Sequence, residues 1–431
     1  MTRKTRCLIG NPPCGLAGRT FRAILAHRCN PLGKIARKET ADLRTQQRCP
    51  RPAAGNRRGD GMTKILHVIT STQVGGAENH LLTLATALLR EGWTSEVAYL
   101  KGREDLNQEF VGRGIPVHPL HLRPWCDSAA LRRLIHFIRD RRPDIVHAHL
   151  FPAEVYATAA AMLSGGHAKL VCTKHNDDDF LRRPHFRLLH WLISYRAART
   201  IAISEHVRRY ALAIGTADAS RLVTIPYGYD GGDSTGKPPG IRQELGIGSG
   251  TFLIGSVGRL APQKGQRYLL EAVQKMVAAG EDVALVLVGE GALLGTLKAQ
   301  VVAAGLGRHV FFIGFRQDVR DLMPAFDVFA LPSLWEGFGL VLLEAMAASR
   351  AIVASRVSAI PEVVEDGVTG LLVPPGDSGA LAEALVALRH DDVRRERLGV
   401  AGAERLRRQF ALERMVERTI EVYKTVLGER S

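Results

Sequence analysis

The chain has 431 residues, a hydrophobic content of 46% and a formal net charge of +15. This length exceeds what one ordinary hydrophobic core needs, so two domains are expected. The mostly apolar runs, such as residues 155–163, are far shorter than the roughly 18 residues of a membrane-spanning helix. We therefore expect no transmembrane segment and only peripheral contact with a membrane.

The basic charge is concentrated at the N-terminus. Residues 1–61 carry 14 Lys and Arg against three acidic residues, a net charge of +11, which leaves only +4 for the rest of the chain. This segment contains Pro, Gly and Arg throughout and shows no sustained hydrophobic period. We interpret it as a non-structural, disordered extension, with Met62 as the functional start of the protein. A targeting peptide and a nucleic-acid-binding arm are the alternatives, and we expect no nucleic-acid partner.

Four of the six cysteines lie in this extension, and their wide spacing matches no zinc-binding pattern. Only Cys126 and Cys172 remain in the rest of the chain, which suits a reducing compartment. We therefore expect a cytoplasmic protein, or one at the inner face of the cytoplasmic membrane.

From Met62 the pattern alternates between strand and helix. A strand at residues 65–69 is followed by a loop with Gly75 and Gly76 and then by a helix. Gly75 and Gly76 resemble a phosphate-binding turn but lack the full dinucleotide fingerprint. Alternating strands and helices predict a parallel sheet covered by helices. Further strands are expected at residues 96–100, 144–149, 170–175 and 200–204.

A run rich in Gly and Pro at residues 231–240 predicts a linker, after which the alternation restarts. We therefore expect two Rossmann-like, doubly wound α/β domains that face one another across a cleft. Their predicted ranges are 62–230 and 231–411. The apolar stripe of residues 413–427 predicts an amphipathic helix with one face to bury.

Residues 327–347 organise the second domain. A buried strand at 328–331 and a helix at 340–347 flank the loop Glu336-Gly337-Phe338-Gly339. Its two glycines allow the backbone to approach a ligand, and the helix start offers free N–H groups to an anion. Glu336 and Glu344 are placed to accept hydrogen bonds from sugar hydroxyls. The alternative is one capping and one solvated glutamate.

A second loop follows the strand at residues 252–257 and contains Arg259 and Lys264. It lies at the carboxyl end of a parallel strand, where open sheets bind ligands. The guanidinium of Arg259 and the ammonium of Lys264 can reach one diphosphate, although a solvated basic loop would have the same composition.

These motifs together resemble the retaining nucleotide-sugar glycosyltransferases of family 4, which have the GT-B fold. The resemblance covers nearly everything from Lys64 to the C-terminus. It implies that residues 412–431 cross back and pack on the N-terminal domain, for which the apolar stripe gives a physical reason. It implies transfer of a sugar from a nucleoside diphosphate donor, with retention of configuration and without a metal or another cofactor. The motifs are Gly258-Arg259-Leu260 with Lys264-Gly265, Gly289-Glu290-Gly291, Phe312-x-Gly314, and Glu336 through Glu344.

The resemblance also implies a role for each matching residue. Arg259 and Lys264 would bind the diphosphate, Glu344 would accept from the ribose, and Glu336 would contact the donor sugar. Backbone N–H groups in the segment Gly337-Phe338-Gly339-Leu340 would help, and Gly314-Phe315-Arg316 would border the base.

In the N-terminal half, His149 ends a strand where family members place a histidine near the donor sugar. His147 lies on the same face of that strand. A zinc site of His147, His149 and His175 is conceivable, but a packed core histidine is the preferred interpretation of His147. The acidic run 177–179 is interpreted as solvated rather than metal-binding.

Residues 182–199 combine Leu and Trp with several Arg. They predict either a core helix with basic ends or a basic amphipathic face resting on anionic lipid. The family resemblance implies a glycan or lipid-linked acceptor, in cell-envelope or exopolysaccharide assembly. The alternatives are another GT-B enzyme, such as a nucleotide-sugar epimerase or glycogen-type synthase, and a non-catalytic nucleotide-sugar-binding protein.

Overall fold

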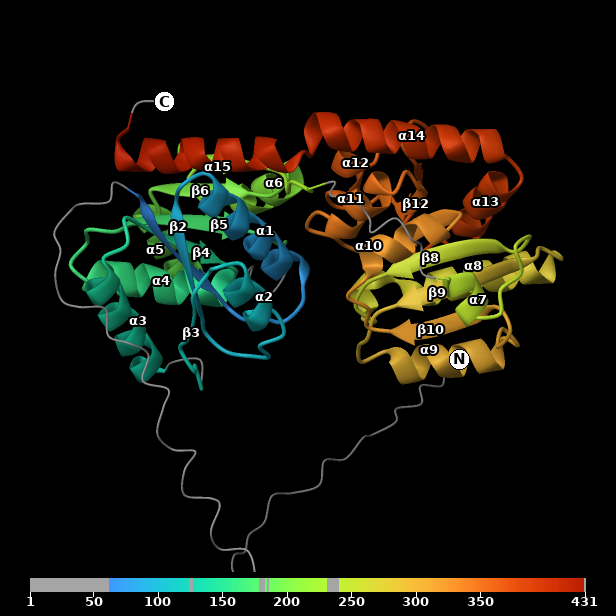
Figure 1. The fold of residues 1–431 in the computed structure, drawn as a ribbon, viewed down its shortest axis with the longest axis horizontal. Helices are drawn as coiled ribbons and strands as arrows, with labels where there is room; N and C mark the ends of the chain where they lie inside the picture. The colour runs from blue at the N-terminus through green and yellow to red at the C-terminus, as the bar shows by residue number, and fades with distance from the viewer. Residues whose placement is uncertain (1–61, 124–126, 178–182, 184–185, 231–239, 430–431) are drawn as a thin grey trace, which may run out of the picture. The chain divides into compact units, whose positions relative to one another are not determined.

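The computed structural model describes residues 62–123, 127–177, 183, 186–230 and 240–429, shown in Figure 1. The extension 1–61, most of the expected linker, and Cys126, Asp178 and Asp179 lie outside these ranges. The expectations for them therefore stay predictions.

The first half of the described chain is built on one parallel sheet. Its seven strands run in the order β3-β2-β1-β4-β5-β6-β7, and every neighbouring pair is parallel. The parallel α/β sheet predicted from the alternating pattern is confirmed. The strands are β1 (Lys64–Ile69), β2 (Thr94–Tyr99), β3 (Val117–Pro119), β4 (Ile145–His149), β5 (Lys169–Lys174), β6 (Arg199–Ala202) and β7 (Leu222–Thr224).

Helices cover both faces of this sheet. Successive side chains of a strand point to opposite faces, so the apolar residues of each strand are buried against helices on both sides. Ile65 and Ile145 belong to the cluster with α1 (Gly76–Arg90) and α15 (Leu412–Leu427). Leu66 and Val146 instead belong to the cluster with three helices of the other face. Those three are α3 (Ser128–Arg141), α4 (Phe151–Leu163) and α5 (Arg187–Arg196); the shorter helices are α2 (Asn107–Gly112) and α6 (Glu205–Ala213).

The second half repeats this architecture with six parallel strands in the order β10-β9-β8-β11-β12-β13. All six residues of its second strand along the chain, Val283–Val288, are buried, as expected for a strand covered on both faces. The strands are β8 (Phe252–Val257), β9 (Val283–Val288), β10 (Val310–Gly314), β11 (Val328–Leu331), β12 (Ala351–Ser355) and β13 (Leu371–Val373).

The helices of this half again divide between two apolar clusters. The segment after β10 does not form one long helix: α10 (Val319–Leu322) is short, and Met323–Ala325 forms a 3₁₀ turn. Pro324 explains the interruption, because proline has no N–H to continue the α-helical ladder. The other helices are α7 (Ile241–Glu244), α8 (Gln266–Ala278), α9 (Leu294–Ala303), α11 (Leu340–Ala347), α12 (Ile360–Val363), α13 (Ser378–Arg389) and α14 (Asp392–Gln409).

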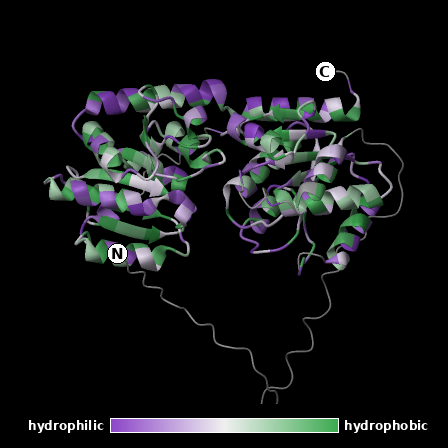
Figure 2. Cartoon of the chain, turned by 180° about the vertical axis from the view of Figure 1, so that it is seen from behind, coloured by the Kyte–Doolittle hydropathy of each residue, from purple (hydrophilic) through white to green (hydrophobic). Residues whose placement is uncertain are grey.

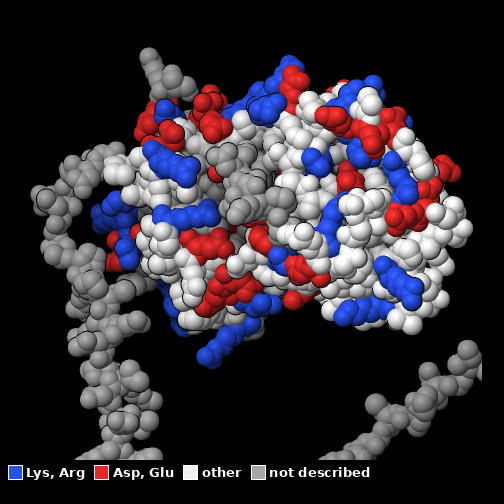
Figure 3. Space-filling model, turned by 45° about the vertical axis from the view of Figure 1, so that its right-hand side comes forward, with Lys and Arg blue, Asp and Glu red and all other residues white. Residues whose placement is uncertain are grey.

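The surface agrees with a folded body of small net charge. In Figure 2 the strands are mostly apolar, whereas outward turns of helices such as α14 are hydrophilic. Over the face drawn in Figure 3, basic and acidic side chains are interspersed. Within the described ranges, none of the helices combines the length and apolar character needed to span a bilayer.

Each sheet has one position where the strand order reverses, between β1 and β4 in the first and between β8 and β11 in the second. Ligands of open α/β sheets bind beyond the carboxyl ends of the strands at such a position. The residues predicted to form the site lie at or just beyond the carboxyl ends of these four strands: Gly75 follows β1, His149 ends β4, Arg259 follows β8 and Glu336 follows β11.

Candidate active site

The loop between β11 and α11 is shaped by its two glycines. Gly339 has a φ of +86° and directly precedes the helix, which has no side-chain cap, so its first N–H groups face outward. A Cβ atom on Gly337 would lie 2.3 Å from the carbonyl oxygen of His175. A side chain at position 337 is therefore incompatible with this contact, which brings the loop against the end of β5.

Lys264 and Glu336, predicted from separate motifs, form an ion pair. Lys264 ends the 3₁₀ turn Pro262–Lys264 after β8, and its Nζ lies 2.5 Å from Oε2 of Glu336. Ser333 Oγ donates a hydrogen bond of 3.3 Å to the same oxygen. The structure thus holds a cation and a hydrogen-bond acceptor together beside the N-terminus of α11.

Arg259 is exposed and has no ion-pair partner among the described residues. Its charge acts on Glu78, a buried carboxylate in the first turn of α1. Burial raises the pKa of Glu78, while hydrogen bonds from its own backbone and from Ser71 and the charge of Arg259 oppose this rise. The sequence analysis did not select Glu78, although an acid directly after Gly75-Gly76 at a helix start was an available signal.

Glu344 lies on α11 in a different electrostatic setting from Glu336. Burial raises the pKa of Glu344 to about 7, and the charge of Arg320 opposes that rise. Arg320 Nε in turn donates a 2.9 Å hydrogen bond to the hydroxyl of Tyr229. Phe315, expected to border the base, is 47% exposed. The two predicted carboxylates therefore interact with different cations, Glu336 with Lys264 and Glu344 with Arg320.

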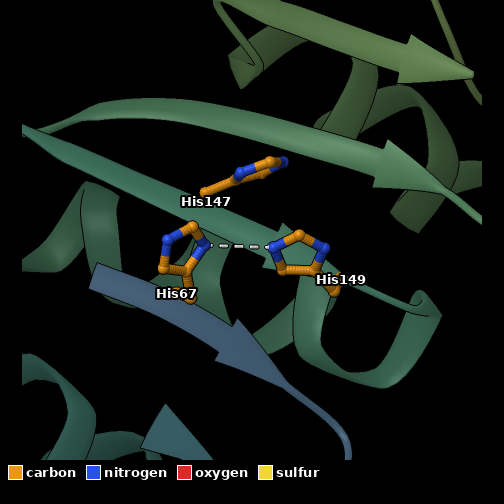
Figure 4. A group of neighbouring side chains, drawn as sticks. All are labelled: His67, His147 and His149. Atoms are coloured by element: carbon orange, nitrogen blue, oxygen red, sulfur yellow. Dashed lines mark hydrogen bonds between the residues drawn. The ribbon is translucent and has the colours of Figure 1, made fainter. Parts of the chain in front are cut away.

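In the first half, three buried histidines lie side by side at the reversal point of the sheet, as Figure 4 shows. His147 and His149 are on β4, and His67 is on β1 directly opposite His147. The sequence pattern pointed to His147 and His149 but not to His67. Its position could have been inferred, because aligning the two strands at the switch point places residue 67 beside residue 147.

His147 is a packed core histidine, as predicted. Its Nδ1 lies 2.7 Å from the hydroxyl of Tyr423 on α15, and its Nε2 lies 2.7 Å from the hydroxyl of Thr173 on β5. Burial lowers its pKa well below the usual value, so the ring is neutral. Through this contact His147 ties the last helix of the chain to the first sheet.

His149 has both ring nitrogens occupied by other histidines. Its Nε2 lies 3.2 Å from Nδ1 of His67, and its Nδ1 lies 3.1 Å from Nε2 of His175. Burial lowers the pKa of His149 well below its usual range. The resemblance places His149 near the donor sugar, and a direct contact between its ring and that sugar would require one of these two hydrogen bonds to be exchanged.

The three histidines at the reversal point are already engaged in hydrogen bonds. One ring nitrogen from each of His67, His147 and His149 lies within 4.8 Å of the others. Both nitrogens of His147 are engaged by hydroxyl groups, and both nitrogens of His149 by imidazoles. Three neutral histidines are a ligand set that zinc accepts, so a metal ion would have to replace these hydrogen bonds. Independence from metal remains a prediction about activity.

The Glu-Gly-Phe-Gly loop and α12 contact the end of β6. Ser204 Oγ donates to the carbonyl of Gly337 at 3.1 Å. The carboxylate of Glu362 accepts from the backbone N–H groups of Glu205 and His206, at 2.7 and 2.6 Å, and thereby caps α6. His206 also binds Asp177 at 2.7 Å, so the expectation of a solvated Asp177 is wrong, because burial beside this histidine favours a paired carboxylate.

Comparison with known proteins assigns both halves. A family model described as "Glycosyltransferase Family 4" matches residues 74–231, and one described as "Glycosyl transferases group 1" matches residues 239–405. A phosphatidyl-myo-inositol mannosyltransferase of Mycobacterium leprae is 32% identical over 374 residues, covering 82% of this chain and 93% of that protein.

Two further proteins extend the comparison. An Escherichia coli UDP-Gal:alpha-D-GlcNAc-diphosphoundecaprenol alpha-1,3-galactosyltransferase is 28% identical over 281 residues, covering 62% of this chain and 72% of that protein. The crystal structure of Anabaena HepE in complex with UDP and glucose has a TM-score of 0.75 and 25% identity, covering 84% of this chain and 100% of that chain. With its two parallel-sheet, Rossmann-like halves, the chain belongs to the family 4 glycosyltransferases of the GT-B fold.

Proposed function

We propose that the protein transfers a sugar from a nucleoside diphosphate donor to a lipid-linked or glycan acceptor, with retention of configuration and without a metal or other cofactor. The observation that carries this proposal is the 2.5 Å contact between Lys264 and Glu336 beside the uncapped start of α11. A diphosphate and a hexose hydroxyl are the partners that this ammonium, carboxylate and helix terminus together would bind.

In the proposed reaction, the bond between the anomeric carbon and the diphosphate oxygen breaks. The departing diphosphate gains negative charge, which Lys264, Arg259 and the N-terminus of α11 would stabilise in place of a divalent ion. The acceptor hydroxyl oxygen forms the new bond on the same face of the sugar, and its proton passes to the departing phosphate oxygen. Release of Lys264 to the diphosphate would free Glu336 to accept from a sugar hydroxyl.

A cavity of about 770 Å³ in the first half is the proposed acceptor site. It lies where β2 and β3 end and α3 begins, and Lys101, Arg123 and Arg133 line it together with Glu104 and Asp127. The mannosyltransferase and galactosyltransferase relatives are named for phosphatidyl-myo-inositol and for a diphosphoundecaprenol, which both contain phosphate. Arg133 already contacts Asp127 at 3.7 Å, so Lys101 and Arg123 are the cations proposed to bind the phosphate of such an acceptor. The names of these relatives are the basis for proposing a role in envelope or exopolysaccharide assembly.

The exposed side of α5 is the proposed membrane contact. Leu188, Trp191 and Tyr195 are 72%, 58% and 61% exposed, and the two aromatic rings are stacked. Exposed Arg183 and Arg196 are close in sequence. Apolar and aromatic side chains with neighbouring Arg are typical of helices that rest on anionic lipid, so an acceptor anchored in a membrane would be within reach.

The test is a screen of UDP- and GDP-sugars, with and without phospholipid and polyprenyl diphosphate acceptors, in the presence of EDTA. We expect acceptor-dependent release of nucleoside diphosphate and a product with the anomeric configuration of the donor, read by NMR. An inverted product would overturn retention, and a strict requirement for manganese or magnesium would overturn metal independence. Donor epimerisation without acceptor, or binding without turnover across the panel, would favour the alternatives.

A further inference from the structure

Four buried side chains form one continuous hydrogen-bonded chain beneath the candidate site. The hydroxyl of Tyr227 lies 2.6 Å from Nδ1 of His175, and the chain continues through His149 to His67 at 3.1 and 3.2 Å. None of the four is more than 4% exposed. A chain of this kind is constrained as a unit, because each ring has only two nitrogens and both nitrogens of His149 and His175 are used.

All three imidazoles are neutral. Burial lowers the pKa of His67 to about 3 and lowers the pKa values of His149 and His175 well below the usual range. A neutral imidazole has one N–H donor and one lone-pair acceptor, so a ring that accepts at one nitrogen must donate at the other. The direction of the first hydrogen bond therefore fixes the tautomer of every ring in the chain.

Tyr227 sets that direction. Burial, with nearby Glu78 and Glu336, raises its pKa well above the usual value, so the phenol keeps its proton. A protonated phenol needs an acceptor for its O–H, and Nδ1 of His175, 2.6 Å away, is the hydrogen-bond partner of this hydroxyl among the described residues. Tyr227 thus donates to Nδ1 of His175, which makes all three histidines Nε2–H tautomers. His67 Nε2 ends the chain, with no partner among the described residues.

The hydrogen-bonded chain of Tyr227, His175, His149 and His67 also contacts two parts of the candidate site, the Glu-Gly-Phe-Gly loop and the junction between β4 and α4. The ring of Tyr227 packs edge-on against Phe338 of the Glu-Gly-Phe-Gly loop, with centroids 5.2 Å apart. His149 is followed by Leu150, whose φ of +71° and ψ of 148° lie in a region that only glycine adopts easily. Strained backbone of this kind persists only where the surrounding structure over-determines it.

We infer that Tyr227, His175 and His67 are positioning residues that hold His149 in one tautomer and one ring orientation, and thereby fix the strained junction between β4 and α4 under the donor sugar. This inference rests on the transfer reaction proposed above. In this role Tyr227, His175 and His67 act through His149 and do not contact the substrate themselves. Their loss should affect turnover more than nucleotide binding, because the diphosphate ligands lie in the other half of the chain.

The first experiment reads the tautomers directly and does not depend on knowing the substrate. In the full-length protein labelled with ¹⁵N-histidine, long-range ¹⁵N correlation spectra near neutral pH should show His67, His149 and His175 as neutral Nε2–H tautomers. An Nδ1–H form of His149, or a mixture of both tautomers, would overturn the inference even if the proposed reaction is correct. Finding no turnover with any donor would instead count against the proposed function.

The second experiment uses two variants of nearly equal size at one buried position. In His67→Asn the side-chain oxygen can accept the hydrogen bond from His149 Nε2–H, whereas His67→Leu cannot. We expect His67→Leu to release the His149 tautomer and to lower kcat by roughly 10-fold to 10²-fold with little change in donor KM. His67→Asn should restore the single tautomer and most of kcat. Equal losses of kcat in both variants would show that His67 acts only through packing and would contradict its role as a positioning residue.

Two variants complete the test. Tyr227→Phe keeps the ring against Phe338 but removes the donor hydroxyl, so it should mix the tautomers of His149 from the other end of the chain. His80→Phe is the matched control: His80 is equally buried and stacks on Tyr227 at 4.4 Å, but no hydrogen bond joins it to the four-residue chain. It should leave the His149 tautomer and kcat unchanged. A normal single tautomer in both Tyr227→Phe and His67→Leu would refute the inference.

Discussion

The two halves of the molecule place opposite chemistry at the same topological position. Where the strand order reverses in the second sheet, charged side chains collect: Lys264 is paired with Glu336, and Arg259 is exposed. At the corresponding position of the first sheet, His67 and His149 are buried and neutral. The same fold therefore carries a group of charged side chains at this position in one half and a group of neutral, hydrogen-bonded side chains in the other.

The difference shows how the work of a transferase can be divided. Fixed charges suit a ligand whose own charge increases during reaction, as a departing diphosphate does. Hydrogen bonds between neutral groups offer no net charge to attract an ion, but they fix distances and angles, which is what the proposed positioning of a sugar requires. Variants in the two halves should therefore affect different measured quantities.

The largest effect is expected for the charged half. Lys264→Ala should weaken binding of the free nucleoside diphosphate and slow transfer by roughly 10²-fold or more, because a fixed cation is lost where charge develops. Calorimetry and initial rates would measure the two losses. Lys298→Ala, at an exposed lysine of α9, is the control and should change neither. Normal rates in Lys264→Ala would remove this residue from the proposed site.

His149→Ala should separate the two halves most clearly. We expect nucleotide affinity close to that of the unaltered protein and transfer slowed by roughly 10-fold to 10²-fold, since only the geometry around the sugar changes. Calorimetry with the nucleoside diphosphate and circular dichroism would be run on the same sample. If the folded variant lost nucleotide binding as completely as Lys264→Ala, the division of labour would be mistaken.

A smaller effect should come from pH. Burial raises the pKa of Glu344 to about 7, so this carboxylate is partly protonated near neutrality. A ribose hydroxyl donates to the ionised form, so nucleotide affinity should rise with pH up to about 7 and then level off. Below that value it should fall by up to roughly tenfold per pH unit. Glu344→Gln should bind more weakly and lack this dependence; an unchanged profile would exclude Glu344 as the ribose ligand.

The smallest effect is expected at the proposed membrane contact of α5. Trp191→Ser should lower binding to anionic vesicles by about tenfold, the loss of roughly 1–2 kcal/mol of buried apolar contact, and leave the rate with a soluble acceptor unchanged. Val302→Ser, at a valine of α9 that is 79% exposed, is the control. Sedimentation with vesicles measures both, and equal binding by the two variants would contradict the proposed contact at α5.

Local sequence signals predicted much of the second half. The helix expected at residues 340–347 is α11, and the strand expected at 328–331 is β11, because apolar runs bounded by Gly and Pro identify both elements. The ion pair between Lys264 and Glu336 was not predicted, although each residue was selected. Seventy-two positions separate the two residues, and only the pairing of β8 with β11 brings them together.

The histidine chain shows why the first half was harder to predict. His67 lies within a strand that, apart from exposed Lys64 at its start, is otherwise apolar and buried, so its local sequence predicted no more than a buried position. Its neighbours come from β4 and β5, and their identity depends on strand order and register. By contrast, the 3₁₀ turn at Met323–Ala325 depends on a local signal, because Pro324 in the sequence itself indicates where an α-helix cannot continue.

The histidine cluster also has a consequence for acid stability. Five buried histidines have folded-state pKa values below the ordinary 6.5, and all five are 7% exposed or less. Unfolding releases each ring to water, where it takes up a proton once the pH falls below about 6.5. The stability provided by the neutral rings is complete above that pH and declines as the pH falls toward their folded-state values. The five are His67, His80, His147, His149 and His175.

Because all five rings lose this stability over the same pH range, their effects add, and the free energy of unfolding should fall steeply as the pH drops below about 6.5. Unfolding of the first half in mild acid should therefore be steep and accompanied by uptake of about five protons. The same uncharged interior that positions His149 would therefore make the first half sensitive to acid, because protons bind to the histidines of the unfolded chain and shift the equilibrium toward unfolding.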